Sequence, residues 1–280
     1  MLQLSRAAYY RHWVDKEPDQ AEMALRDAVQ KECLSHRFYG YRRIAVLIQR
    51  HGLVASEKVV RRIMHNDNLL VARRRKFVAT TDSNHGFRIH PNLARYMQVD
   101  LPDQLWVADM TYIRLRGEFV FLAVVLDAWS RNVLGWQLGR TLKAELPLAA
   151  LKKAIQTRQP KPGLVHHNDG GSQYACHDYV GELEAIGAVM SMSAPGRPWE
   201  NAICESFMNT LKREEIDARA YTNMEHLEQN IEEFIESIYN RVRLHSALGY
   251  LSPAEFESKI SPCGWRPAPL LLNLRQEVTV

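Results

Sequence analysis

The feature that most limits the fold of this chain is a run of eight apolar residues, 119–126 (FVFLAVVL). It is the longest purely apolar run in the sequence. A helix needs about 20 such residues to cross a bilayer, so this run is too short to do so. Turn-forming residues bound it, Gly117 before and Ser130 after, and together these features predict a strand buried on both faces.

The neighbouring segments predict a sheet around this strand. Residues 106–115 (WVADMTYIRL) and 133–138 (VLGWQL) are rich in β-formers and are joined to it by short turns, which predicts an antiparallel meander. Further along, apolar periodicity predicts alternating helices and short strands: helix 144–157, strand 164–167, helix 176–186, strand 188–190, and helices 202–215 and 224–239. This order predicts a mixed α/β sheet of the ribonuclease H-like class.

The first hundred residues instead predict a small all-α region. Residues 21–36, 41–51 and 57–66 have helical composition, and Ser56 is placed to cap the third helix. The second and third helices, joined by a tight turn, have the outline of a helix-turn-helix. Basic residues lie off the apolar stripe of the third helix, and four more cations follow: Lys58, Arg61 and Arg62, then Arg73, Arg74, Arg75 and Lys76. We expect these residues to bind DNA, although a solvated helical hairpin would show the same pattern.

Charge divides along the chain in the same way. Residues 1–100 hold 18 Lys and Arg against 10 Asp and Glu, whereas residues 101–280 hold 18 against 22. A basic region neutralises phosphates and releases their counterions, so the front of the chain favours nucleic acid; asymmetry without function is the alternative. We expect a DNA-binding region at 1–76, a linker at 77–100, a catalytic core at 101–260 and a C-terminal tail at 261–280, in which no motif is evident.

The four cysteines, Cys33, Cys176, Cys204 and Cys263, are scattered and form no CxxC pair. This usage predicts neither a disulfide framework nor a zinc module. The N-terminus has no long apolar segment of the kind found in secretory signals. We therefore expect a protein of the reducing cytoplasm.

Three carboxylates stand out by their settings. Asp109 lies within an apolar strand, where a carboxylate is costly unless it is paired or binds a metal. Asp169 follows a short strand, at the end where open α/β sheets place their sites, and Glu205 lies opposite the apolar face of a helix. Such carboxylates, converging at a sheet end, would hold two Mg²⁺ ions for phosphoryl transfer. Spacing alone is weak evidence, because Asp178 and Glu214 are separated by the same 35 residues as Asp169 and Glu205.

Four ordered segments carry a family resemblance: 106–113 (WVADMTYI), 167–174 (HNDGGSQY), 191–214 (SMSAPGRPWENAICESFMNTLKRE) and 239–253 (YNRVRLHSALGYLSP). They resemble the second-reading-frame transposase of the IS3 insertion-sequence family and, more distantly, retroviral-type integrase cores. Residues 36–52 resemble the helix-turn-helix-like segment that precedes these cores. The resemblance covers roughly residues 21–257. Asn168, Gly170 and Glu200 depart from the residues usual in the family, but none replaces an expected metal ligand.

The resemblance implies that Asp109, Asp169 and Glu205 are the catalytic and metal-binding triad and that Lys212, seven positions after Glu205, contacts DNA. It implies a transposase that cuts DNA at insertion-sequence ends and joins it to target DNA, using two Mg²⁺ ions with Mn²⁺ as a substitute. The implied partners are double-stranded DNA, further copies of the chain, and the first-frame protein or a fusion with it. The expected location is the bacterial cytoplasm, at the nucleoid during action, with no membrane.

Several alternatives stay open from the sequence. A ribonuclease H-like nuclease would use the same acids without joining DNA, and a repressor or inactive remnant would use only residues 21–76. Asp127 suits a turn better than a fourth acid of the site. His166 and His167 could orient the loop before Asp169 or meet a phosphate, and His245 could support either DNA or the core.

Overall fold

The computed structural model describes residues 20–71, 90–115, 117–194 and 196–260. The chain divides into two compact units, Met1–Phe77 and Val78–Val280. Four of the residues expected to bind DNA, Arg73, Arg74, Arg75 and Lys76, lie outside the described residues, as does the tail at 261–280.

The described part of the first unit contains three helices, α2 (Gln20–Ser35), α3 (Tyr41–Arg50) and α4 (Glu57–Asn66). The Ser56 hydroxyl accepts a hydrogen bond from the backbone N–H of Val59 at 3.4 Å, so it caps α4 as the sequence predicts. Apolar side chains spaced three and four residues apart on α3 and α4 are buried between the helices: Ile44, Ile48, Val60, Ile63 and Met64. The predicted helices are confirmed, and α3 and α4 form the helix-turn-helix pair.

The second unit is built on one sheet of five strands, β1 (Leu105–Leu115), β2 (Glu118–Asp127), β3 (Val133–Gly139), β4 (Val165–Asn168) and β5 (Val189–Met192). Their spatial order is β3-β2-β1-β4-β5. β1, β2 and β3 pair antiparallel, which confirms the predicted meander, whereas β4 pairs parallel to β1 and β5 pairs parallel to β4. β4 pairs only with residues 105–107 of β1, so β1 continues beyond its parallel neighbour.

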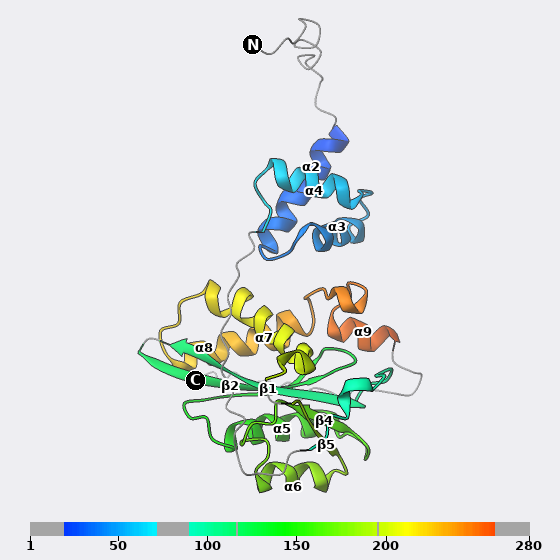
Figure 1. Cartoon of the computed structure of the whole chain (residues 1–280). Helices are drawn as coiled ribbons and strands as arrows, with labels where there is room; N and C mark the ends of the chain where they lie inside the picture. Colours follow the sequence, from blue (N-terminus) through cyan, green and yellow to red (C-terminus); the bar gives the residue numbers. More distant parts are fainter. Residues whose placement is uncertain (1–19, 72–89, 116, 195, 261–280) are drawn as a thin grey trace, which may run out of the picture. The chain divides into compact units, whose positions relative to one another are not determined.

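Helices cover both faces of this sheet (Figure 1). α5 (Glu145–Arg158) and α6 (His177–Ala185) pack on one face. On the other lie α7 (Ala202–Glu214), α8 (Met224–Glu232) and the π-helix Glu233–Tyr239 that continues α8. α9 (Pro253–Ile260) follows, and short 3-10 turns occur at Ala94–Tyr96, Pro198–Asn201, Ile216–Ala218 and Ser246–Leu248. Because both faces are covered, β2 is a nearly continuous apolar run, as expected from residues 119–126.

α5 approaches β3 closely at Gly135. A Cβ atom at Gly135 would meet the carbonyl oxygen of Ala150 and would lie 2.7 Å from the backbone nitrogen of Ala154. Glycine on the strand and alanine on the helix therefore allow a contact that larger side chains would prevent.

The described end of the predicted linker, residues 90–100, packs onto the sheet and helices of the second unit. Ala94, Met97 and Val99 contact its apolar core. The Ser191 hydroxyl accepts a hydrogen bond from the backbone N–H of Leu93 at 2.9 Å. The apolar residues of this segment explain why it packs against the core rather than running free.

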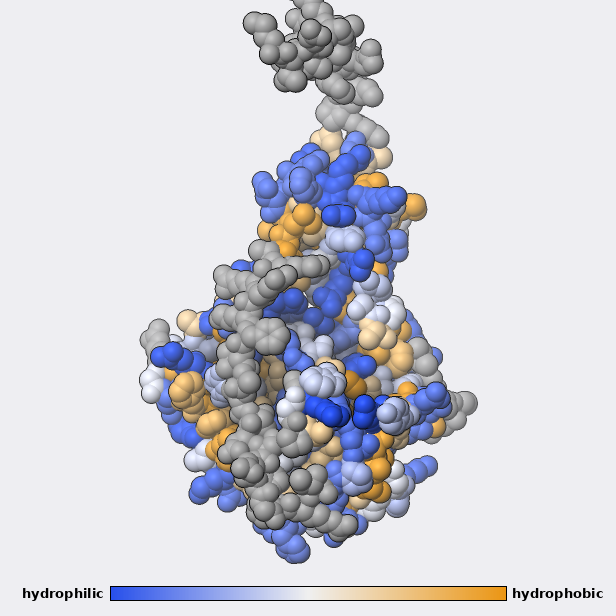
Figure 2. All heavy atoms as spheres, viewed as in Figure 1, coloured by the Kyte–Doolittle hydropathy of each residue, from blue (hydrophilic) through white to orange (hydrophobic). Residues whose placement is uncertain are grey.

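Hydrophilic residues cover much of the face visible in Figure 2, and apolar residues form smaller patches between them. Among the described residues, no helix is both long and apolar enough to cross a membrane.

Candidate active site

Asp109 lies on β1, two residues beyond the last pairing with β4. Its side chain is half-buried, and its Oδ1 accepts a hydrogen bond from the backbone N–H of Met110 at 2.8 Å. Burial and the neighbouring charge of Asp169 raise the pKa of Asp109 to about 7, and Glu205 adds to the rise. The Met110 N–H and Lys212 oppose the rise without cancelling it. Burial, together with the neighbouring negative charge, therefore outweighs the donors around Asp109.

Asp169 begins the loop that follows β4. The side-chain oxygen of Asn168 accepts a hydrogen bond from the backbone N–H of Gly170 at 2.9 Å, and Asp169 Oδ1 accepts one from Gly171 at 3.1 Å. Gly170 has a φ of +72°, a left-handed conformation that glycine adopts without strain. The departures from the family pattern at Asn168 and Gly170 thus build a tight turn that holds Asp169 at the strand end.

Glu205 is exposed in the first turn of α7. The start of this helix is tied to β1, because the amide of Asn201 donates a hydrogen bond to the carbonyl oxygen of Ala108 at 2.9 Å. α7 packs on the sheet face toward which Leu105 and Val107 of β1 point, and by strand alternation Asp109 points to the same face. Asn201 is a site residue that sequence reasoning did not identify as an anchor, although its position four residues before Glu205 is on the same helical face.

The structure thus places both other predicted acids within electrostatic range of Asp109, since the charges of Asp169 and Glu205 each raise its pKa. Within the described ranges, however, no group of three His, Cys, Asp or Glu side chains is arranged to hold one metal ion. The charges of the acids interact, but their side chains do not form a complete set of ligands around one position. Their oxygen donors and unbalanced negative charge suit a hard divalent cation such as Mg²⁺.

Lys212 also lies at this site, but it does not project freely into solvent. Its Nζ is 5.1 Å from the ring centroid of Tyr112 on β1, and the side chain is half-buried. Burial lowers the pKa of Lys212, and the charge of Asp109 partly offsets this effect. Lys212 is therefore a cation beside the acidic group, at the part of β1 that extends past β4.

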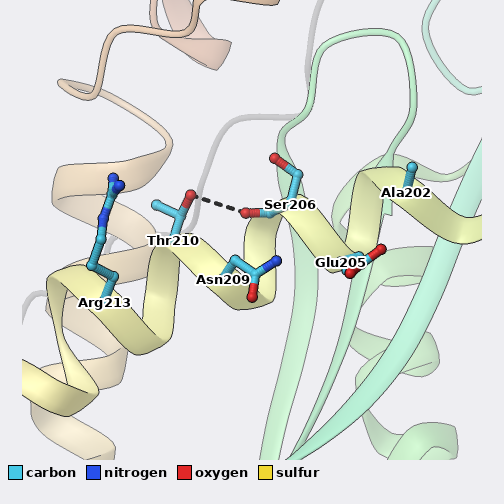
Figure 3. Close-up of a pocket in the computed structure, with 6 residues that line it drawn as sticks. All are labelled: Ala202, Glu205, Ser206, Asn209, Thr210 and Arg213. Atoms are coloured by element: carbon cyan, nitrogen blue, oxygen red, sulfur yellow. Dashed lines mark hydrogen bonds between the residues drawn. The ribbon is translucent and has the colours of Figure 1, made fainter. Parts of the chain in front are cut away.

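A polar groove of about 340 Å³ runs along α7 from Glu205 (Figure 3). Its lining residues recur every three or four positions on one helical face: Ala202, Glu205, Ser206, Asn209, Thr210 and Arg213. The Thr210 hydroxyl donates a hydrogen bond to the Ser206 carbonyl oxygen at 2.9 Å, which turns it toward the helix backbone. The groove joins a catalytic candidate to a row of neutral hydrogen-bonding groups and ends at a cation.

His166 and His167 are structural rather than exposed at the site. His167 is hydrogen-bonded by its two ring nitrogens to the hydroxyls of Ser191 at 2.8 Å and Ser193 at 2.9 Å. His166 shares a hydrogen bond of 3.1 Å with the Tyr179 hydroxyl. Burial lowers the pKa of both imidazoles, so both rings are neutral near pH 7.

Asp127 and His245 are both buried and have structural roles. The Asp127 carboxylate accepts hydrogen bonds from the backbone N–H and hydroxyl of Ser130 at 2.8 and 2.7 Å, so it closes the turn after β2. His245 is buried against Tyr239, with ring centroids 4.8 Å apart, and therefore supports the core.

In the first unit, the predicted DNA-binding residues of α4 differ in their surroundings. Arg62 lies 3.3 Å from Glu22 of α2 in an exposed ion pair, and the Arg61 guanidinium lies 5.6 Å from the Tyr41 ring centroid. Lys58 is exposed one turn before Arg61 and Arg62. All three cations lie on the solvent side of α4.

Comparisons with known proteins agree with this architecture. Models of the integrase core domain match residues 100–198 and 187–253, and a model of an HTH-like domain matches residues 20–77. The chain is 35% identical over 261 residues to the Insertion element IS600 uncharacterized 31 kDa protein of Shigella sonnei, covering 91% of this chain and 96% of that protein. It is 31% identical over 269 residues to Transposase InsF for insertion sequence IS3A of Escherichia coli K12, covering 92% of each.

Among solved structures, a chain of the simian T-cell lymphotropic virus intasome in complex with PP2A regulatory subunit B56 gamma is similar in fold. The TM-score is 0.50 at 14% identity, over 86% of this chain and 77% of that chain. With the family models, this likeness confirms the predicted ribonuclease H-like core and the helix-turn-helix-like region before it.

Proposed function

Because the chain belongs to the IS3 family of insertion-sequence transposases and is a DNA transposase of the Asp-Asp-Glu class, we propose that Asp109, Asp169 and Glu205 are its catalytic acids. The observation that carries this assignment is the coupling of the three charges. The pKa of Asp109 rises to about 7 through burial, then through Asp169, with a contribution from Glu205. Burial also raises the pKa of the structural carboxylate Asp127, to about 6, but there the hydrogen bonds of Ser130 oppose the rise most strongly, whereas at Asp109 the charge of Asp169 adds to it.

We propose that the three acids hold divalent metal, with two Mg²⁺ ions as the working form and Mn²⁺ as a substitute. Ions bound there would supply activation of an attacking oxygen and stabilisation of a leaving oxygen. The chain's own contribution is to hold Asp109 within β1, Asp169 directly after the neighbouring β4, and Glu205 on a helix tied to β1 through Asn201. Lys212, beside Asp109, adds a fixed positive charge for a phosphate.

The proposed reaction has two steps. First, a water oxygen attacks the phosphorus at an end of the element, the bond to the 3′ oxygen breaks, and a 3′-hydroxyl is released. Second, that hydroxyl attacks a phosphodiester of the target DNA and displaces another 3′ oxygen. The second step exchanges one phosphodiester for another, so it needs no energy from a nucleoside triphosphate. In agreement, the sequence has no GxxxxGK[ST] loop, the motif that binds the phosphates of such nucleotides.

DNA would contact two surfaces, one on each unit. On the catalytic unit, the groove along α7 leads from Glu205 to Arg213 and is lined with groups able to bond phosphate oxygens. On the first unit, Lys58, Arg61 and Arg62 lie on the solvent side of α4, the second helix of the helix-turn-helix pair. Arg73, Arg74, Arg75 and Lys76, which lie outside the described residues, are proposed to bind DNA as well.

We further propose that residues 1–76 dock on DNA, that 77–100 connect them to the core at 101–260, and that the chain acts as a homo-oligomer on DNA. The first-frame protein, or a fusion with it, would be its partner. The family relationship supports these assignments, and sedimentation of the chain with and without element-end DNA tests the assembly.

The catalytic assignment is tested by Asp169→Asn. The variant should lose cutting of element-end DNA while binding that DNA with wild-type affinity in a gel-shift assay. Asp178→Asn is the matched control, because Asp178 is an exposed acid on α6. Cutting at the wild-type rate by Asp169→Asn would exclude Asp169 from the chemistry.

Strand transfer is tested separately with precut ends and a target plasmid. The wild-type chain with Mg²⁺ should join the two, and Glu205→Gln should not. Hydrolysis of uncut ends without any joining would instead identify a nuclease that uses the same acids.

A further inference from the structure

The hydroxyl of Tyr174 is a buried polar group that has no hydrogen-bond partner in the described part of the chain. The residue is 1% exposed, so solvent does not satisfy it. Proteins satisfy nearly all of their buried polar atoms, because an unpaired one destabilises the fold. An exception next to a catalytic site therefore needs a functional explanation.

Tyr174 belongs to the same turn as Asp169. Its backbone N–H donates a hydrogen bond to the Gly171 carbonyl oxygen at 2.9 Å, and Gly171 in turn donates its N–H to Asp169 Oδ1 at 3.1 Å. A Cβ atom at Gly171 would lie 3.3 Å from Asp169 Oδ1 and 3.9 Å from Tyr174 Cδ2. The tyrosine ring and the Asp169 carboxylate therefore flank one glycine.

The Tyr174 ring is also held in place by a contact with α6. Tyr179 of α6 packs against it edge-on, with ring centroids 5.2 Å apart and an interplanar angle of 88°. Burial raises the pKa of Tyr174 far above its usual value, and the nearby groups Tyr179, Asp169 and Asp109 raise it further. The phenol is therefore a protonated donor that is fixed in place, and its ring lies beside the glycine whose N–H bonds Asp169.

We propose that Tyr174 is a positioning residue for the Asp109–Asp169 pair, whose hydroxyl donates a hydrogen bond to one of these carboxylates when the pair holds a divalent cation. The inference rests on the proposed function. A donor behind a metal-holding carboxylate fixes its orientation, and loss of such a donor weakens metal binding by about 10–100-fold. In the cation-free protein the same hydroxyl lacks an acceptor, so it lowers stability.

Tyr179 provides a matched comparison in the same ring pair. It is also fully buried, but its hydroxyl already shares a hydrogen bond of 3.1 Å with His166 Nε2. Removing one oxygen from each tyrosine in turn therefore separates a hydroxyl that is bonded in the cation-free protein from one that is not.

The experiment measures two quantities on the full chain, for wild type, Tyr174→Phe and Tyr179→Phe. The first is the Tm in EDTA, followed by circular dichroism. The second is the affinity for Mn²⁺ alone, from an electron paramagnetic resonance titration, with Asp109→Asn defining binding outside the site.

Tyr174→Phe should raise the Tm of the cation-free chain by about 2–4 °C and weaken Mn²⁺ binding about 10-fold or more. Tyr179→Phe should lower the Tm and leave Mn²⁺ binding unchanged. A Tm for Tyr174→Phe at or below that of wild type, or unchanged Mn²⁺ affinity, would overturn the inference. If wild type binds no more Mn²⁺ than Asp109→Asn does, the proposed metal site fails instead.

Discussion

Arg243 and Glu214 form a buried ion pair with two contacts, from Nε to Oε2 at 2.9 Å and from Nη2 to Oε1 at 2.8 Å. Both side chains are almost fully buried, at 5% and 6% exposure. Glu214 is the last residue of α7, and Arg243 comes from the segment after the π-helix. The pair therefore fixes the C-terminal end of the helix whose first turn carries Glu205 and whose last turn carries Lys212.

Replacing Glu214 by Gln should lower the free energy of unfolding by about 3–5 kcal/mol, because it leaves the Arg243 charge buried without its partner. Urea unfolding followed by circular dichroism measures this change. The control is Arg213→Ala, which removes the exposed partner of the same carboxylate and should cost less than about 1 kcal/mol. Equal losses of unfolding free energy in the two variants would show that the buried ion pair stabilises the fold no more than the exposed one does.

The same pair predicts an acid-sensitive contribution to stability. Burial alone would raise the pKa of Glu214, but the hydrogen bonds and charge of Arg243 hold it below the usual value. A carboxyl with a lowered folded-state pKa stabilises the fold above about pH 4.3, and this contribution is lost as the pH falls through the folded-state pKa. The difference in unfolding free energy between wild type and Glu214→Gln should therefore narrow below about pH 4. A constant difference from pH 6 to pH 3.5 would contradict it.

Replacing Asn240 should destabilise the fold nearly as much as replacing Glu214, because the Asn240 side chain bonds both backbone polar groups of a residue on β3. Its amide oxygen accepts from the Val133 N–H at 3.0 Å and its amide nitrogen donates to the Val133 carbonyl at 3.1 Å. Asn240→Asp keeps the size but removes the donor and buries a charge, so we expect a loss of several kcal/mol in unfolding free energy. Asn223→Asp, at the exposed cap of α8, is the control and should change it little.

These long-range contacts mark the limit of prediction from sequence. The strands and helices follow from local patterns: the apolar run of β2, the turns around it and the cap at Ser56 are each encoded within a few residues. The partners Arg243 and Glu214 are 29 residues apart, and Asn240 and Val133 are 107 apart. No periodicity links such residues, so the role of the segment 239–253 in fixing α7 and β3 emerges only from the fold.

The acids show the same distinction. Asp178 and Glu214 have the spacing of Asp169 and Glu205, yet Asp178 is exposed on α6 and Glu214 is bound to Arg243. Only the topology, which puts β4 beside β1 and packs α7 against β1, brings Asp169 and Glu205 toward Asp109. The sequence did indicate these acids through their apolar and turn settings. It did not indicate Asn201 as the link to β1 or the unpaired hydroxyl of Tyr174.

Asn201→Ala should slow cleavage by about 100-fold, because small misplacements of a catalytic group have effects of this size. The amide holds the start of α7 to Ala108, next to Asp109. DNA affinity should change less than about twofold, since the groove residues of α7 are intact. Asn230→Ala, which removes a buried amide from α8, is the control for general destabilisation. Equal loss of cleavage in both variants would show that Asn201 has no specific role in positioning the start of α7.

On the first unit, Arg61→Ala should weaken binding to all DNA sequences and reduce the slope of log affinity against log salt by about one. Fluorescence anisotropy at several salt concentrations measures the slope. Arg26→Ala is the control, because that guanidinium is bound to Asp67. An unchanged slope for Arg61→Ala would place the DNA on another surface.

Asp109 should make the metal-free protein less stable as the pH rises. Its folded-state pKa is about 7, raised first by burial and then by Asp169, so the folded form holds a proton that the unfolded form releases near pH 4. The contribution of Asp109 to the free energy of unfolding then falls between about pH 4 and pH 7. Asp109→Asn has no proton to lose at this position, so it should not show this fall. In EDTA the variant should match wild type near pH 4 and exceed it at pH 8 by on the order of 1–3 kcal/mol, a range reduced because the carboxylate is partly exposed.

Urea unfolding in EDTA at both pH values measures this difference, and Asp178→Asn again serves as the control. Adding Mg²⁺ at pH 8 should raise the stability of wild type, because a ligand that binds only the folded state stabilises it. It should not raise that of Asp109→Asn. A variant that gains nothing over wild type at pH 8 would mean that fixed groups of the protein already neutralise Asp109, which would remove the electrostatic reason for a cation at this site.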